Sequence, residues 1–73
     1  GMTTNYDKAR MLVNTMFTAV RIGSSELIKQ THNDYEQNKH VFNGLDYLIQ
    51  TWNHLMRKAN ETLEKDTQDS NLI

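Results

Sequence analysis

The side chains best suited to chemistry lie in the segment THNDYEQNKH, residues 31–40. His32, Glu36 and His40 follow one another at intervals of four, so they would share a face of one continuous helix. Imidazole nitrogens and a carboxylate oxygen are suitable ligands for zinc or a similar ion. A helix-start pattern at Asn33 would instead leave His32 in a turn, with only two ligands together. The three residues are therefore weak candidates for a metal site, and we expect no cofactor.

The other reactive side chains do not form a catalytic pattern. The serines at positions 24, 25 and 70 have no histidine at helical spacing, and no glycine-rich turn surrounds them. The three glycines are isolated from one another, so they cannot form a phosphate-binding loop. Cysteine is absent, which excludes thiolate nucleophiles, thiolate metal ligands and disulfides. We therefore expect a protein that is not an enzyme.

Length and composition indicate one small folded domain, residues 1–73. Apolar residues make up 37% and charged residues 23%, proportions that favour a folded chain over a disordered one. No apolar run approaches the roughly 18 residues of a membrane span, and the first residues lack the apolar core of a signal peptide. A small chain without cysteine favours a cytoplasmic location. The net charge of −1 argues against nucleic acid as a partner.

The apolar residues recur in alternating steps of three and four along two segments, and this spacing is typical of amphipathic helices. Neither segment shows the strict alternation of a strand, so we predict an all-α fold. The first series is Tyr6, Ala9, Val13, Met16, Val20 and Leu27, and the second is Phe42, Leu45, Ile49, Trp52, Met56, Ala59 and Leu63.

Two pairs of polar residues predict where helices begin. Thr4 is followed three residues later by Asp7, and Asn33 by Glu36, as in a capping box. The two starts predict an antiparallel hairpin of two long helices. Gly1 before Met2 resembles a residue left by tag removal, and both chain ends are expected to fray. The predicted helices are residues 5–31 and 34–65, the turn is 32–33, and the frayed ends are 1–3 and 66–73.

A second arrangement uses different breaks. Gly23 with the serines after it could end one helix and begin the next, and the dipeptide Asn43-Gly44 favours a turn. These breaks predict a three-helix bundle with helices near 5–22, 25–40 and 44–65.

The hairpin makes specific claims about packing. With the turn at 32–33, Val13 faces Trp52, which predicts that the tryptophan is buried within the chain. In the same register Gly23 faces Phe42, so the glycine would provide room for the ring and would not end a helix.

Beside the main apolar stripe, the hairpin leaves a second apolar row uncovered on one side. The opposite row, which includes Arg10 and Phe17, is mostly polar. A lone hairpin of this size has little stability to spare, so we expect two copies to bury the apolar row in a four-helix bundle. In the three-helix arrangement the same residues would fill the core of one chain. The predicted interface of the homodimer or higher oligomer is Leu12, Ala19, Val41, Leu48 and Leu55.

These features together predict a non-enzymatic helical module that acts by oligomerising and by binding another protein. The alternative is a small DNA-binding regulator on three helices, a size and class shared with helix-turn-helix domains. Against that alternative, the segment from Asn43 to Asp46 lacks the basic residues that would favour DNA at the start of a recognition helix.

Overall fold

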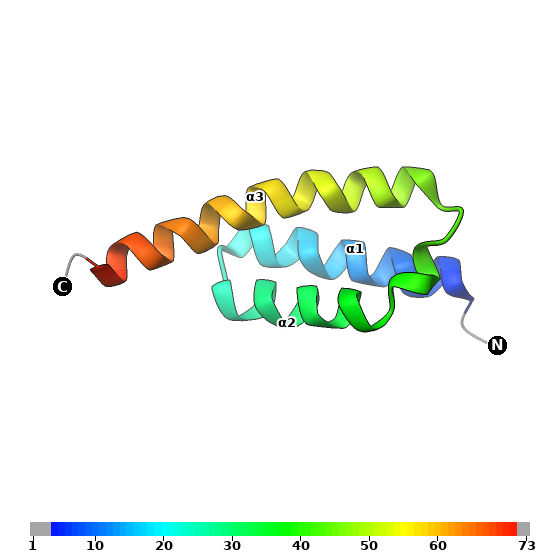
Figure 1. Ribbon diagram of the computed structural model, residues 1–73, viewed down its shortest axis with the longest axis horizontal. Coiled ribbons are helices and arrows are strands. Elements are labelled where there is room, and N and C mark those ends of the chain that lie inside the picture. Colours follow the sequence, from blue (N-terminus) through cyan, green and yellow to red (C-terminus); the bar gives the residue numbers. More distant parts are fainter. Residues whose placement is uncertain (1–3, 72–73) are drawn as a thin grey trace.

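The computed structural model describes the backbone of residues 4–71 and the side chains of residues 4–66. The elements are α1 (Asn5–Ile22), α2 (Ser25–Gln37), a short 3₁₀ helix η1 (Lys39–Phe42) and α3 (Asp46–Asn71). Helix α2 runs back along α1, and α3 then runs parallel to α1 (Figure 1). Every element of the described chain is helical, so the all-α prediction is confirmed. Residues 1–3 and 72–73, expected to fray, lie outside the described residues.

Over residues 4–71 the chain forms three α-helices, so the two-helix hairpin is wrong and the three-helix alternative is correct. Gly23 ends α1 in the left-handed conformation, with φ of 71°. Its N–H donates to the Val20 carbonyl, and the N–H of Ser24 donates to the Ala19 carbonyl, which completes a Schellman motif. A Cβ added to Gly23 would meet no atom within 4 Å. The glycine therefore serves the backbone turn and does not make room for Phe42.

Helix α2 begins at Ser25, inside the first helix of the predicted hairpin. It then continues through residues 32–33, where the hairpin had its turn. The Ser24 hydroxyl accepts a hydrogen bond from the Leu27 N–H at 3.2 Å, which caps the helix start. Asn33, expected to begin a helix, lies in the middle of α2. The serine cap follows directly on the glycine turn, so the two local signals reinforce each other.

One outer end of the predicted hairpin agrees with the structure, and the other does not. At Thr4 the capping box is present as predicted: the Asp7 N–H donates to the threonine hydroxyl at 3.1 Å, and the Thr4 N–H donates to the Asp7 carboxylate at 3.4 Å. At the other end, α3 does not stop near residue 65. Its backbone stays helical through Asn71, so residues 66–71 belong to the helix.

The core is built from one stripe of each helix together with η1. Trp52 is only 2% exposed, as predicted. Its ring lies edge-on to Tyr35, with centroids 4.3 Å apart, and Tyr35 also stacks on Phe42 at 4.9 Å. These aromatic contacts fasten α2 and η1 to α3. The buried hydrophobic residues are Ala9, Val13, Met16, Ala19, Ile28, Val41, Phe42, Leu48, Trp52, Leu55 and Ala59.

The row expected to form a homodimer interface belongs to this core. Four of its members are buried, and the fifth, Leu12, is half-buried against the cluster. The expectation assumed that α1 continued past Gly23, whereas the turn there brings α2 and η1 back over the first helix. The row therefore packs within one chain, and its burial does not require a second copy. The four buried members are Ala19, Val41, Leu48 and Leu55.

Candidate functional site

A surface groove with a volume of about 510 Å³ lies between the parallel helices α1 and α3. We call it the α1/α3 groove. Its floor is apolar, and its rim carries exposed aromatic side chains among polar ones. The residues that line it are Tyr6, Arg10, Val13, Asn14 and Phe17 of α1 and Tyr47, Leu48, Thr51 and Leu55 of α3.

The aromatic rim is the most unusual feature of this groove. Tyr6 is 50% exposed, Phe17 57% and Tyr47 78%, although each is a large side chain that water solvates poorly. Both tyrosines are the second residue of their helix, and the two helices begin at the same end of the bundle (Figure 1). Phe17 lies three turns further along α1. The rim therefore has tyrosines at one end and a phenylalanine near the other.

The charge within the described lining of the groove is positive. Of the nine described residues that line it, Arg10 alone is charged. Arg21 follows Phe17 by four residues and Lys58 follows Leu55 by three, so both continue the same side of their helices, and both are exposed. Two acidic residues lie beside these cations: Asp7, three residues before Arg10, accepts the Thr4 N–H at the helix start, and Glu61 follows Lys58 by three residues. A ligand with negative charge would meet attraction along this groove.

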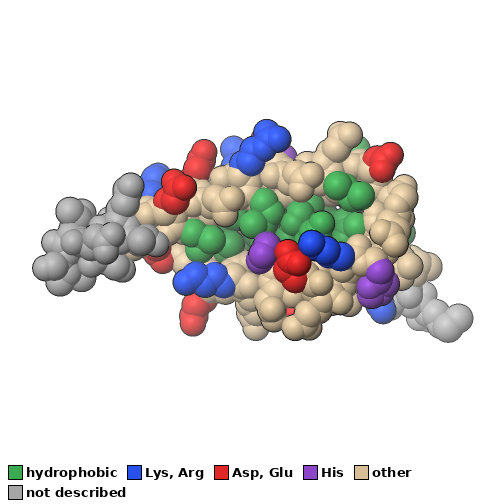
Figure 2. Space-filling model, viewed as in Figure 1, with side chains coloured by type: hydrophobic (Ala, Val, Ile, Leu, Met, Phe, Trp, Pro, Cys, Tyr) green, Lys and Arg blue, Asp and Glu red, His purple; other side chains and the backbone are tan. Residues whose placement is uncertain are grey.

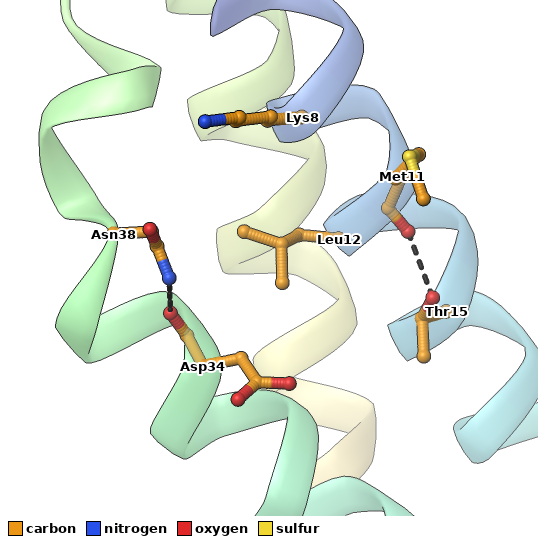
Figure 3. A pocket seen from close by; sticks show the side chains of 6 residues that line it. All are labelled: Lys8, Met11, Leu12, Thr15, Asp34 and Asn38. Carbon is orange, nitrogen blue, oxygen red and sulfur yellow. Dashed lines mark hydrogen bonds between the residues drawn. The ribbon is translucent and has the colours of Figure 1, made fainter. Parts of the chain in front are cut away.

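A smaller groove of about 310 Å³ lies on the other side of α1, against α2 (Figure 3). We call it the α1/α2 groove. Its polar groups bond within their own helices: the Asn38 amide donates to the Asp34 carbonyl and the Thr15 hydroxyl to the Met11 carbonyl, both at 2.9 Å. Charges of opposite sign face it from the two helices. The residues that line it are Lys8, Met11, Leu12, Thr15, Asp34 and Asn38.

The third side of the bundle is the seam between α2 and α3, along which hydrophobic side chains are visible (Figure 2). Side chains of α2 and η1 pair with one another: the Glu36 carboxylate lies 3.5 Å from the Nε2 of His32 and 3.2 Å from the Nζ of Lys39. The hydroxyl of Ser25 donates to the carboxylate of Asp66, which ties the start of α2 to α3.

The candidate metal ligands do not come together as one site. His32 and Glu36 are neighbours on α2, but His40 lies in η1, beyond the end of that helix. Lys39 already pairs with the Glu36 carboxylate. The described side chains contain no group of three histidine or acidic residues that could hold a metal ion.

Sequence reasoning named Leu48 and Leu55 as interface residues, but it missed Phe17 and Tyr47 of the rim of the α1/α3 groove. Phe17 falls in a row that is otherwise polar, and Tyr47 lies outside the apolar repeat. One signal was available: Phe17 follows Val13 by four residues and Tyr6 by eleven, so an aromatic stripe borders the core stripe of α1.

Comparison with protein-family models, curated proteins and solved structures finds no match to this chain. Within the described residues, none of the helices combines the length and apolar character needed to cross a membrane.

Proposed function

We propose that this protein is a non-enzymatic helical module that binds a partner protein through the α1/α3 groove. The observation that carries the proposal is a rim of three aromatic side chains, each at least half exposed, around an apolar floor. A large aromatic side chain has roughly 150–250 Å² to bury, and each Å² removed from water contributes about 25 cal/mol. Tyrosine and arginine, both present here, are also enriched among the residues that dominate binding energy at interfaces.

The other surfaces support this function less well. In the α1/α2 groove the described side-chain amide and hydroxyl groups bond within their own helices, and the groove is smaller. DNA binding by α3 is the alternative function, but the first turn of that helix carries Asp46, which would repel phosphate. A cytoplasmic location remains part of the proposal, because a chain this small that lacks cysteine suits a reducing compartment.

The test compares two variants of α1 that change similarly exposed side chains on opposite sides of the helix. Phe17→Gln removes an aromatic group from the rim of the α1/α3 groove, and Met11→Gln removes a 64% exposed side chain outside it. Each protein is used to capture partners from extracts of the native host, and a captured protein is then purified for calorimetric titration.

We expect a partner that binds the wild type and the Met11 variant alike but binds the Phe17 variant about tenfold more weakly or worse. Thermal melts of all three proteins establish that the variants are folded. Equal affinity of the wild type and the Phe17 variant for every captured protein would overturn the proposal.

A further inference from the structure

The dimensions of the α1/α3 groove define the size of a ligand. On α1 the lining extends from Tyr6 to Phe17, a separation of eleven positions and so about 16 Å of helix. On α3 it extends from Tyr47 to Leu55, or about 12 Å. A ligand that fills the groove therefore matches about three turns of helix in length.

The walls of the groove define the secondary structure of the ligand. Both walls are helices, whose backbone groups are already paired along α1 and α3, so they offer no free edge to an extended strand. Recognition must then occur through side chains. A helix that lies along the groove presents a continuous apolar stripe to the floor formed by Val13, Leu48 and Leu55. The exposed aromatic rings would close over its sides.

The charges around the groove define which residues flank the apolar stripe of the ligand. Arg10 lies within the groove, and Arg21 and Lys58 continue the basic edge on the next turns. Acidic residues beside the apolar stripe of the ligand would face these groups. A second copy of the chain in a twofold contact would instead bring the basic edges of the two grooves together, which is unfavourable.

We infer that the α1/α3 groove binds an amphipathic helix of about three turns from another protein, with acidic residues flanking its apolar stripe. This inference rests on the proposed function and specifies the chemistry of the partner. Nucleic acid fits less well, because the floor is aliphatic and only Arg10 among the described lining residues is cationic.

The experiment is a selection from a displayed library of helix-forming peptides of about 16 residues, enough for three turns and their ends. The library keeps an apolar stripe and randomises the flanking positions between acidic, basic and neutral residues. The full chain is the target. The enriched peptides are then titrated against Phe17→Gln and Arg10→Gln, with Met11→Gln and Lys8→Gln as matched controls from the α1/α2 groove.

We expect the enriched peptides to be acidic at the flanks and to bind the Phe17 variant about tenfold more weakly or worse. The Arg10 variant should weaken their binding about two- to fivefold, an effect that added salt reduces, because exposed ion pairs contribute little. Neither control should change the affinity. Peptides that depend on Phe17 but have neutral or basic flanks would overturn the acidic partner and leave the proposed function standing.

Other outcomes identify other occupants and also overturn the inference. A library without enrichment contradicts the helical ligand, while the capture experiment still decides the proposed function. Sedimentation equilibrium at roughly tens of micromolar tests for a second copy. A dimer lost in the Phe17 variant and kept in the Met11 variant would assign the groove to self-association. Tighter, Phe17-dependent binding of a single-stranded oligonucleotide of about 20 nucleotides would assign it to nucleic acid.

Discussion

The two sides of helix α1 differ in the kind of side chain that each leaves exposed. Toward α2, only two residues connect the helices, and small side chains such as Ala19 allow close packing. Toward α3, which reaches α1 only after α2 and η1, the helices run parallel, and large aromatic side chains stay on the rim. Both sides contribute to the core to a similar extent. Toward α3, however, the aromatic side chains on the rim stay exposed, and their apolar area remains for binding.

The largest expected effect comes from the floor of the α1/α3 groove. Leu55→Ala removes a buried leucine that contacts the core, so it should lower the free energy of unfolding by about 2–5 kcal/mol. Leu12→Ala, the matched change at the half-buried edge of the α1/α2 groove, should cost less than half as much. Urea denaturation measures both. Equal losses would mean that the floor of the α1/α3 groove is no more a part of the core than the edge of the other groove.

The turn that brings α2 back along α1 gives the next effect. Gly23→Ala places a Cβ on a residue with φ of 71°, which should cost about 1–2 kcal/mol in unfolding free energy. The space around the residue is open, so the cost is conformational and Gly23→Asn should recover part of it. Urea denaturation again measures the change. Equal stability of the Gly23→Ala and Gly23→Asn variants would contradict a backbone origin of the loss.

The start of α1, where the aromatic rim begins, gives a smaller effect. Thr4→Ala removes the hydroxyl that accepts the Asp7 N–H, and loss of such a cap typically costs about 1 kcal/mol. Thr62→Ala, at an exposed hydrogen bond within α3, serves as the control and should change stability by less than about 0.5 kcal/mol. A loss in the Thr62 variant as large as that in the Thr4 variant would mean that the cap stabilises the protein no more than an ordinary exposed hydrogen bond.

The smallest expected effect on stability separates binding from folding. Phe17→Gln and Met11→Gln should each change the unfolding free energy by less than about 0.5 kcal/mol, since both side chains are mostly exposed. Thermal and urea denaturation provide the measurement. A loss above about 2 kcal/mol for the Phe17 variant would place that ring in the core and remove it from the binding surface.

Much of the fold was predictable because it depends on local spacing. The three-four repeat indicates helices wherever the chain can bury one face, and Trp52 lies in that repeat and is buried. The Thr4 capping box needs only residues three apart, so it is present as predicted. The first helix of the three-helix alternative, residues 5–22, agrees with the structure at both ends.

The choice between two and three helices was not predictable from the same signals. Capping patterns at Asn33 and at Ser24 have similar local energies, of about 1 kcal/mol each, so neither excludes the other. Two heptad repeats also match in some register by chance, which made the hairpin plausible. What separates the arrangements is the apolar row that includes Ala19 and Leu55, which the hairpin leaves in water and the three-helix chain buries.

The sequence alone therefore specifies the helical class and the cap at the start of the first helix, because each depends on neighbours within a few positions. Tertiary structure alone decided which apolar side chains remain outside. Phe17 and Tyr47 are thirty residues apart in the chain and border one groove only because the turn at Gly23 sends α2 to the other side of α1. Burial is a property of the whole packing arrangement, so the location of the exposed aromatic surface follows from the path of the chain.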